Sequence, residues 1–196
     1  MAKEVKPYVV GMDIGGTNTV FGIVDQAGNV VCQDSIKTKA YPVIDDYVNA
    51  IGEKLDVLIE SVGGKDKIQG MGVGAPNGNY YTGNIEFAPN LAWKGIVPLA
   101  KLFSERIGVP CKLTNDANAA AIGEMTYGAA KGMKHFIMIT LGTGVGSGIV
   151  IDGKMVYGHD GFAGELGHII AVPDGRECGC GRKGCLEAYC SATGIV

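Results

Sequence analysis

The chain opens with three segments rich in apolar residues, at 8–16, 19–25 and 30–38. A polar, glycine-rich stretch, Asp13-Ile14-Gly15-Gly16-Thr17-Asn18, lies between the first two, and the turn-forming sequence Gln26-Ala27-Gly28-Asn29 lies between the last two. Short connections of this kind join neighbouring antiparallel strands. The pattern therefore predicts a three-stranded meander whose first hairpin carries a polar tip.

Helical and strand-like patterns then alternate along the chain. The predicted elements are helix 47–62, strand 68–75, helix 97–107, strand 109–114 and a helix from 115 to about 130. Residues 77–95 contain many turn-forming residues, so we expect a long loop with one hairpin, and long loops are often functional. The element order β-β-β-α-β-α-β predicts an α/β layer fold for residues 1–116.

A second meander follows. Strand 135–141, a glycine-rich loop at 142–148 and strands 149–151 and 154–157 repeat the arrangement at the start of the chain. Gly16-Thr17 in the first meander and Gly142-Thr143 in the second occupy matching positions. We therefore expect two related lobes, 1–116 and 117–196, that face each other across a cleft.

The second lobe is expected to be incomplete. Its meander and cysteine-rich segment are followed only by the helical-looking sequence CLEAYCSATGIV. The first meander, by contrast, is followed by two helices and two strands. This difference suggests that the chain is a fragment of a longer protein.

Composition narrows the class of protein. Hydrophobic residues make up 46% of the chain, charged residues 19%, and the net charge is −3. This balance suits a globular core and gives no indication of binding to nucleic acid or to anionic membranes. No apolar run is long enough for a membrane-spanning helix, and the N-terminal sequence MAKEVKPYVV lacks the apolar region of a secretory signal. We expect a cytoplasmic protein.

Three cysteines and one histidine have the spacing of a metal site. The sequence CGCGRKGC places Cys178, Cys180 and Cys185 within eight residues, and His168 precedes them by ten. Structural zinc takes four nitrogen or sulfur ligands, and clustered cysteines in a cytosolic chain indicate metal more often than disulfides. Cys190 is the spare thiol. The simpler alternative for His168 is a hydrogen-bonded histidine in the core.

The two glycine-rich hairpins suit phosphate groups, because glycine lets backbone N–H groups approach an anion closely. An aspartate beside a triphosphate, here Asp13, can hold Mg²⁺ through water. Asp116 lies where a strand meets a helix, and its simplest role is to cap that helix. A carboxylate at a strand end can also accept a proton from a substrate hydroxyl, which is the base that phosphoryl transfer requires.

Further polar residues fit a substrate rich in hydroxyl groups. Glu165 and Glu187 flank the cysteine segment, and Asn90 lies in the long loop near Trp93. Glutamates are usually solvated surface residues, but Glu165 stands between glycines and apolar residues. Acids that accept hydrogen bonds from several hydroxyls are what a sugar site needs.

Six motifs, in this order, resemble the ROK (repressor, open reading frame, kinase) sugar kinases, and among them most closely the bacterial ATP-dependent glucokinases. The motifs are DIGGT at 13–17, APN at 88–90, NDANAA at 115–120, LGTGVGSG at 141–148, GELGH at 164–168 and CGCGRKGCLE at 178–187. The resemblance implies an actin-like, ribonuclease H-like fold with two lobes. It also implies transfer of the γ-phosphoryl group of ATP to the 6-hydroxyl of glucose.

The resemblance assigns a role to individual residues. Asp116 would be the catalytic base. The sugar-binding residues would be Asn90, Asn115, Asp116, Glu165, His168 and Glu187. The phosphate-binding residues would be Gly15, Gly16, Thr17, Thr143 and Gly144, with Asp13 near Mg²⁺. Structural Zn²⁺ would be bound by His168, Cys178, Cys180 and Cys185.

Length is where the chain departs from the family, whose members are longer. We therefore expect an incomplete ATP site, poor activity of residues 1–196 alone, and a homo-oligomer only for the full-length protein. Three alternatives remain. The substrate could be N-acetylglucosamine, N-acetylmannosamine, mannose or fructose. A sugar-sensing regulator would need a DNA-binding domain, for which there is little room before residue 13. In a zinc hydrolase, the metal would keep a position open for water.

Overall fold

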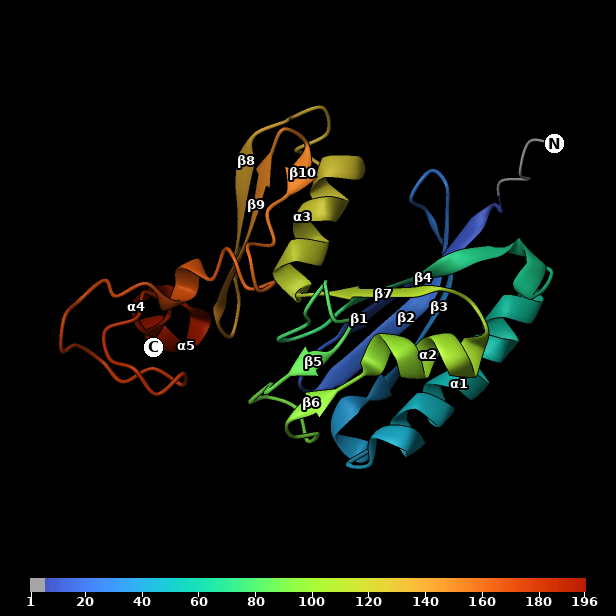
Figure 1. The fold of residues 1–196 in the computed structure, drawn as a ribbon, viewed down its shortest axis with the longest axis horizontal. Coiled ribbons are helices and arrows are strands. Elements are labelled where there is room, and N and C mark those ends of the chain that lie inside the picture. The colour runs from blue at the N-terminus through green and yellow to red at the C-terminus, as the bar shows by residue number, and fades with distance from the viewer. Residues whose placement is uncertain (1–5) are drawn as a thin grey trace. The chain divides into compact units, whose positions relative to one another are not determined.

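The computed structural model describes residues 6–196 (Figure 1). The first five residues of the N-terminal stretch considered above lie outside the described residues. The chain divides into two compact units, one ending at Asp116 and the other running from Ala117 to Val196. We refer to them as unit 1 and unit 2.

Unit 1 is built on a five-stranded sheet with the order β3-β2-β1-β4-β7. Its strands are β1 (Tyr8–Ile14), β2 (Asn18–Asp25), β3 (Val30–Lys37), β4 (Ile68–Gly74) and β7 (Cys111–Thr114). The strands β1, β2 and β3 pair antiparallel, which confirms the predicted meander. The pairings of β1 with β4 and of β4 with β7 are parallel, so these three strands end at the same edge of the sheet.

Two helices of unit 1, α1 (Ile44–Ser61) and α2 (Leu99–Ile107), lie side by side along the sheet (Figure 1). Each buries an apolar stripe at helical spacing, with Ile51 and Leu55 of α1 and Phe103 of α2 fully enclosed. Helix α2 is terminated by Gly108, which adopts a left-handed conformation with φ 80°. Burial of these stripes against the sheet forms the core of unit 1.

Short elements connect the larger ones. The two-residue strands β5 (Ile85–Glu86) and β6 (Ile96–Val97) pair antiparallel, so the predicted hairpin is confirmed. It extends beyond the predicted loop 77–95, because Val97 belongs to β6 and α2 begins only at Leu99. Single 3-10 turns, η1 (Thr38–Ala40) and η2 (Lys65–Lys67), follow β3 and precede β4.

Unit 2 contains a three-stranded antiparallel sheet with the order β10-β9-β8. Its larger elements are α3 (Asp116–Thr126), β8 (Phe136–Leu141), β9 (Val145–Ile151) and β10 (Lys154–Met155). The short turns η3 (Leu166–His168), α4 (Glu187–Cys190) and α5 (Ala192–Ile195) follow. This sheet repeats the meander order of unit 1, and the α/β fold class is confirmed.

The predicted boundary of the second glycine loop is wrong, because β9 begins at Val145 and includes Gly146 and Gly148. A side chain at either glycine would meet α3: a Cβ on Gly146 would lie 2.9 Å from Cβ of Ala117, and one on Gly148 would lie 2.7 Å from Cβ of Ala121. These glycines allow strand and helix to pack closely. Only residues 142–144 form the loop.

Helix α3 ends at Thr126, four residues earlier than predicted. The carboxylate of Glu124 accepts a hydrogen bond from the backbone N–H of Ala129 at 2.7 Å and occupies the space beside Gly128. The Ala129 N–H thus bonds to a side chain and not to the backbone carbonyl that would continue the helix, and the chain enters a turn. Alanine-rich composition alone gave no indication of the stop.

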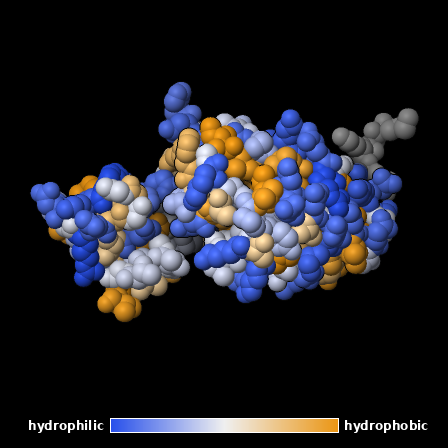
Figure 2. Space-filling model, turned by 90° about the horizontal axis from the view of Figure 1, so that it is seen from below, coloured by the Kyte–Doolittle hydropathy of each residue, from blue (hydrophilic) through white to orange (hydrophobic). Residues whose placement is uncertain are grey.

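None of the described helices combines the length and the apolar character needed to cross a membrane. On the face shown in Figure 2, hydrophilic residues surround smaller groups of hydrophobic ones. The largest fully buried side chains, among them Tyr47, Phe21 and Phe103, belong to unit 1.

Candidate functional site

The parallel strands of unit 1 bring two acidic residues to the same edge of the sheet. Asp13 of β1 stands in register with Gly74 of β4, and Gly74 stands in register with Thr114 of β7. Asn115 and Asp116 follow Thr114 directly. Ligands of α/β sheets typically bind beyond the carboxyl ends of the strands. Asp13, Asn115 and Asp116 therefore stand where a ligand is expected.

The charge of Asp116 acts on Asp13. Burial raises the pKa of Asp13 above its ordinary value, and the negative charge of Asp116 raises it further. Both residues still reach solvent at the sheet edge, so the burial of Asp13 is only partial. Two carboxylates in this arrangement attract a cation or a group that donates protons.

The first glycine loop, residues 15–17, lies beside the long loop that carries Asn90. The backbone N–H of Gly15 donates to the carbonyl of Asn18 at 2.9 Å, which closes the turn. A Cβ on Gly16 would lie 3.1 Å from the Asn90 carbonyl oxygen. The structure thus brings the predicted phosphate loop and one predicted sugar-binding residue into contact within unit 1.

The second glycine loop, residues 142–144, is fixed by Glu187. One carboxylate oxygen of Glu187, Oε2, accepts a hydrogen bond from the backbone N–H of Val145 at 2.8 Å. The same oxygen occupies the space that a Cβ on Gly144 would need. Sequence reasoning gave Glu187 only a role toward the substrate. The structure adds a contact with the glycine loop.

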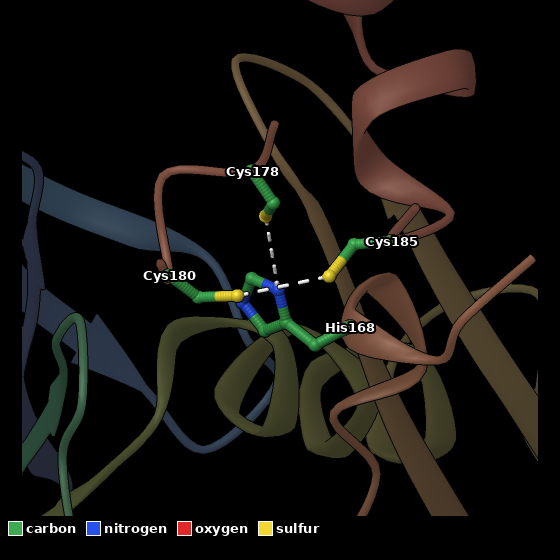
Figure 3. A group of neighbouring side chains, drawn as sticks. All are labelled: His168, Cys178, Cys180 and Cys185. Carbon is green, nitrogen blue, oxygen red and sulfur yellow. Dashed lines mark hydrogen bonds between the residues drawn. The ribbon is translucent and has the colours of Figure 1, made fainter. Parts of the chain in front are cut away.

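The four predicted metal ligands come together in unit 2 (Figure 3). The ligand atoms of His168, Cys178, Cys180 and Cys185 all lie within 4.8 Å of one another. The Cys178 sulfur is 3.6 Å from Nδ1 of His168, and the sulfurs of Cys180 and Cys185 are also 3.6 Å apart. Tetrahedral zinc with Zn–S bonds of about 2.3 Å separates its sulfur ligands by about 3.8 Å. The donor set and its spacing therefore fit zinc.

Arg182 stabilises the cysteine loop from within. Its side chain donates to the carbonyl of His168 at 2.8 Å, and its carbonyl accepts from the backbone N–H of Cys178 at 2.9 Å. Burial opposes ionisation of Cys180, but hydrogen bonds with Arg182, Cys178 and Cys185 together outweigh it and lower the pKa of Cys180 to about 6. A thiolate is the form of cysteine that binds metal.

The segment that carries Glu165 and His168 is anchored by a residue that sequence reasoning missed. The buried hydroxyl of Ser147 in β9 donates to the carbonyl of Gly164 and accepts from the backbone N–H of Leu166 at 3.3 Å. The glutamate itself is exposed. The only signal in the sequence was a polar residue between Gly146 and Gly148.

The chain is similar to known proteins over almost its whole length. The ROK family model matches residues 9–196. A glucokinase of Streptomyces coelicolor is 41% identical over 188 residues, which cover 95% of this chain and 57% of that protein. The xylose repressor of Bacillus subtilis is 31% identical over 193 residues, covering 96% of this chain and 49% of the repressor.

The crystal structure of a ROK family glucokinase from Streptomyces griseus, in complex with glucose and AMPPNP, superposes with a TM-score of 0.80. It is 39% identical in sequence, and the match covers 96% of this chain and 58% of that one. The chain thus spans a little over half the length of the glucokinases that it matches. The likeness confirms the predicted actin-like fold.

Proposed function

Because the chain belongs to the ROK family, we propose that it is the sugar-binding part of an ATP-dependent sugar kinase that phosphorylates glucose at the 6-hydroxyl. The single observation that carries this proposal is the pair of neighbouring carboxylates, Asp13 and Asp116, at the carboxyl ends of parallel strands in unit 1. Phosphoryl transfer needs one carboxylate as a base and another near the metal ion. The similarity to glucokinases supports the choice of reaction.

In this proposal Asp116 acts on the sugar. Its carboxylate, on the first residue of α3, is exposed and accepts the proton of the 6-hydroxyl. The oxygen of the sugar 6-hydroxyl forms a bond to the γ-phosphorus of ATP, while the bond between that phosphorus and the β–γ bridging oxygen breaks. The products are the sugar phosphate and ADP.

The glycine loops would bind the phosphates of ATP. In unit 1 these residues are Gly15, Gly16 and Thr17, and in unit 2 they are Thr143 and Gly144. Asp13 would hold Mg²⁺ through water, and the ion would neutralise phosphate charge. The raised pKa of Asp13 supports this role, because a carboxylate beside another negative charge gains most from a nearby cation.

Six residues would bind hydroxyl groups of the sugar: Asn90, Asn115, Asp116, Glu165, His168 and Glu187. The side chains of Asn90 and Glu165 are exposed, and His168 and Glu187 are partly exposed. Each offers the oxygen or nitrogen atoms that recognise hydroxyls.

Zinc would be held by His168, Cys178, Cys180 and Cys185 and would supply structural stability. Four protein ligands complete its coordination, which leaves no position for a reacting water. The protein's own contribution is to hold His168 and Glu187 at fixed places: Cys178 lies 3.6 Å from the histidine ring and 3.8 Å from Oε1 of Glu187. This arrangement disfavours the zinc hydrolase alternative.

The second candidate is a sugar-sensing regulator, which the similarity to xylose repressors favours. It would bind a sugar without transferring phosphate. Kinases for N-acetylglucosamine, N-acetylmannosamine, mannose or fructose are further alternatives within the proposed reaction.

The release of ADP, measured with glucose and MgATP on the full-length native protein, tests the proposal. Asp116→Asn should lower kcat by about 10²- to 10⁴-fold, the usual contribution of a general base. Asn at this position can still hydrogen-bond a sugar hydroxyl, so glucose binding should persist. Equal turnover by wild type and variant would refute the role of Asp116. Sugar binding by the wild type with no ADP release would favour the regulator.

A further inference from the structure

Three hydroxyl groups form a buried chain beneath the first glycine loop. Oγ1 of Thr19 lies 2.7 Å from the hydroxyl of Tyr47 and 2.9 Å from Oγ1 of Thr38. Oγ1 of Thr38 in turn donates to the carbonyl of Gly15 at 2.8 Å. The exposed fractions of Thr19 and Tyr47 are 0%, and that of Thr38 is 3%.

The direction of these hydrogen bonds follows from the last acceptor in the series, the carbonyl of Gly15. A carbonyl can only accept, so the single proton of Thr38 is used on Gly15. Thr38 must then accept from Thr19, and Thr19 must accept from Tyr47. Donation therefore runs from Tyr47 through the two threonines to the glycine loop, and such chains strengthen each of their bonds.

Thr38 also fixes the other side of the loop. Its backbone N–H donates to the carbonyl of Thr17 at 2.9 Å, so one residue hydrogen-bonds to the loop at both Gly15 and Thr17. The loop is closed internally by the bond from Gly15 to Asn18. Because the carbonyls of Gly15 and Thr17 both accept hydrogen bonds from Thr38, the backbone of the loop is held in one shape.

Tyr47 supports the long loop as well. Its ring lies 4.4 Å from the ring of Trp93, and the indole N–H of Trp93 donates to the carbonyl of Tyr41 at 3.1 Å. Trp93 follows Asn90 by three residues, and the carbonyl of Asn90 packs against Gly16. Tyr47 therefore contacts both Thr19, which belongs to the hydroxyl chain beneath the glycine loop, and Trp93 in the long loop.

Valine has nearly the shape of threonine, and phenylalanine has nearly that of tyrosine. Apolar residues would therefore fit in place of Thr19, Thr38 and Tyr47. Buried hydroxyls add stability only when each is hydrogen-bonded, and they impose one geometry on their partners.

We propose that Thr19, Thr38 and Tyr47 are positioning residues, which set the shape of the glycine loop for phosphate and align it with the loop that carries Asn90. This inference rests on the proposed function, in which the first loop binds phosphate and Asn90 binds sugar. The hydroxyl chain acts on the phosphate side, and the Tyr47–Trp93 contact acts on the sugar side.

The test compares matched variants by calorimetry, with magnesium tripolyphosphate as the phosphate probe and glucose as the sugar. Thr38→Val keeps the shape and removes the hydroxyl, and it should weaken phosphate binding about tenfold, as expected for loss of one hydrogen bond. Its glucose affinity should stay within about twofold. Thr38→Ser keeps the hydroxyl and should bind both ligands as the wild type does.

Two further variants complete the test. Trp93→Phe should show the opposite pattern, with weaker glucose binding and nearly unchanged phosphate binding. Ser104→Ala removes a hydroxyl that donates to the Val109 carbonyl at 2.9 Å, away from both loops, and should change neither. The proposal is overturned if Thr38→Val and Thr38→Ser behave alike, or if Ser104→Ala weakens phosphate binding as much.

Amide hydrogen exchange separates this inference from the proposed function. If the wild type binds neither ligand, the proposed function fails. The exchange of residues 15–18 then decides whether the hydroxyl chain positions the loop. Faster exchange in Thr38→Val than in Thr38→Ser would support positioning, and equal rates would overturn it.

Discussion

Asp13 and Asp116 are far apart in the sequence, yet the negative charge of Asp116 raises the pKa of Asp13. The contact arises because β1, β4 and β7 run parallel and end in register. Burial contributes more than the charge does. Asp13 therefore holds its proton more tightly than an ordinary aspartate does.

Asp116→Asn should lower the pKa of Asp13, because the variant removes the neighbouring charge. The value should remain above that of an ordinary aspartate, since burial is unchanged. Titration of the ¹³C carboxyl shift of Asp13 by NMR measures this directly. Asp34→Asn, on β3 and paired with Lys54 at 2.6 Å, is the control and should leave the titration unchanged. An unaltered Asp13 pKa in Asp116→Asn would show that the acids do not interact.

The contribution of Asp13 to the stability of the protein should decrease as pH rises. A carboxyl with a raised pKa holds its proton more tightly in the folded state, so its contribution to stability is present at low pH and is lost as pH rises through the folded pKa. Asp13→Asn should therefore melt at a higher temperature than wild type at pH 7. The difference should shrink toward pH 3. A difference independent of pH between 3 and 8 would contradict this expectation.

Gly144→Ala should destabilise unit 2, because its Cβ needs the space that Oε2 of Glu187 occupies. The Glu187 carboxylate is the flexible end of its side chain and can move aside, so the main cost is the loss of its hydrogen bond to Val145, about 0.5–1.5 kcal/mol. Gly142→Ala is the matched control, since a Cβ there has nothing within 4 Å. Urea unfolding of both variants measures the free energy of unfolding. Equal losses in the two would mean that Glu187 does not restrain the loop.

Cys180→Ser should lose the metal, because it removes one of four clustered ligands. Elemental analysis should find about one zinc per chain in the wild type and far less in the variant. Cys190→Ser is the control: Cys190 lies outside the cluster, and its thiol donates to the Leu186 carbonyl at 3.3 Å. If Cys180→Ser retained a full equivalent of zinc, the assigned ligand set would be incorrect.

The sequence was sufficient wherever a pattern is local. Apolar segments joined by short turn sequences predicted the first meander, and the spacing of Cys178, Cys180 and Cys185 predicted the metal cluster, because neighbours in sequence supply the signal. Glycine was ambiguous. Gly142 and Gly144 form a loop, whereas Gly146 and Gly148 lie in a strand that packs on α3.

Contacts between distant segments could not be predicted in this way. Tyr47 is the first residue of the predicted helix 47–62, and nothing near it in the sequence indicates that its hydroxyl bonds to Thr19. Glu187 likewise reaches a loop 42 residues earlier in the chain. Such contacts depend on how the elements pack, which periodicity does not describe.

Calorimetric titration of the protein with glucose tests the central claim most directly. We predict that glucose binds at one site per chain, more tightly than N-acetylglucosamine, N-acetylmannosamine, mannose, fructose or xylose, and that Asn90→Ala weakens it. Binding of an N-acetylated sugar with no heat from glucose would contradict the glucokinase assignment. The absence of binding for every sugar tested would contradict the proposal that this chain recognises a sugar.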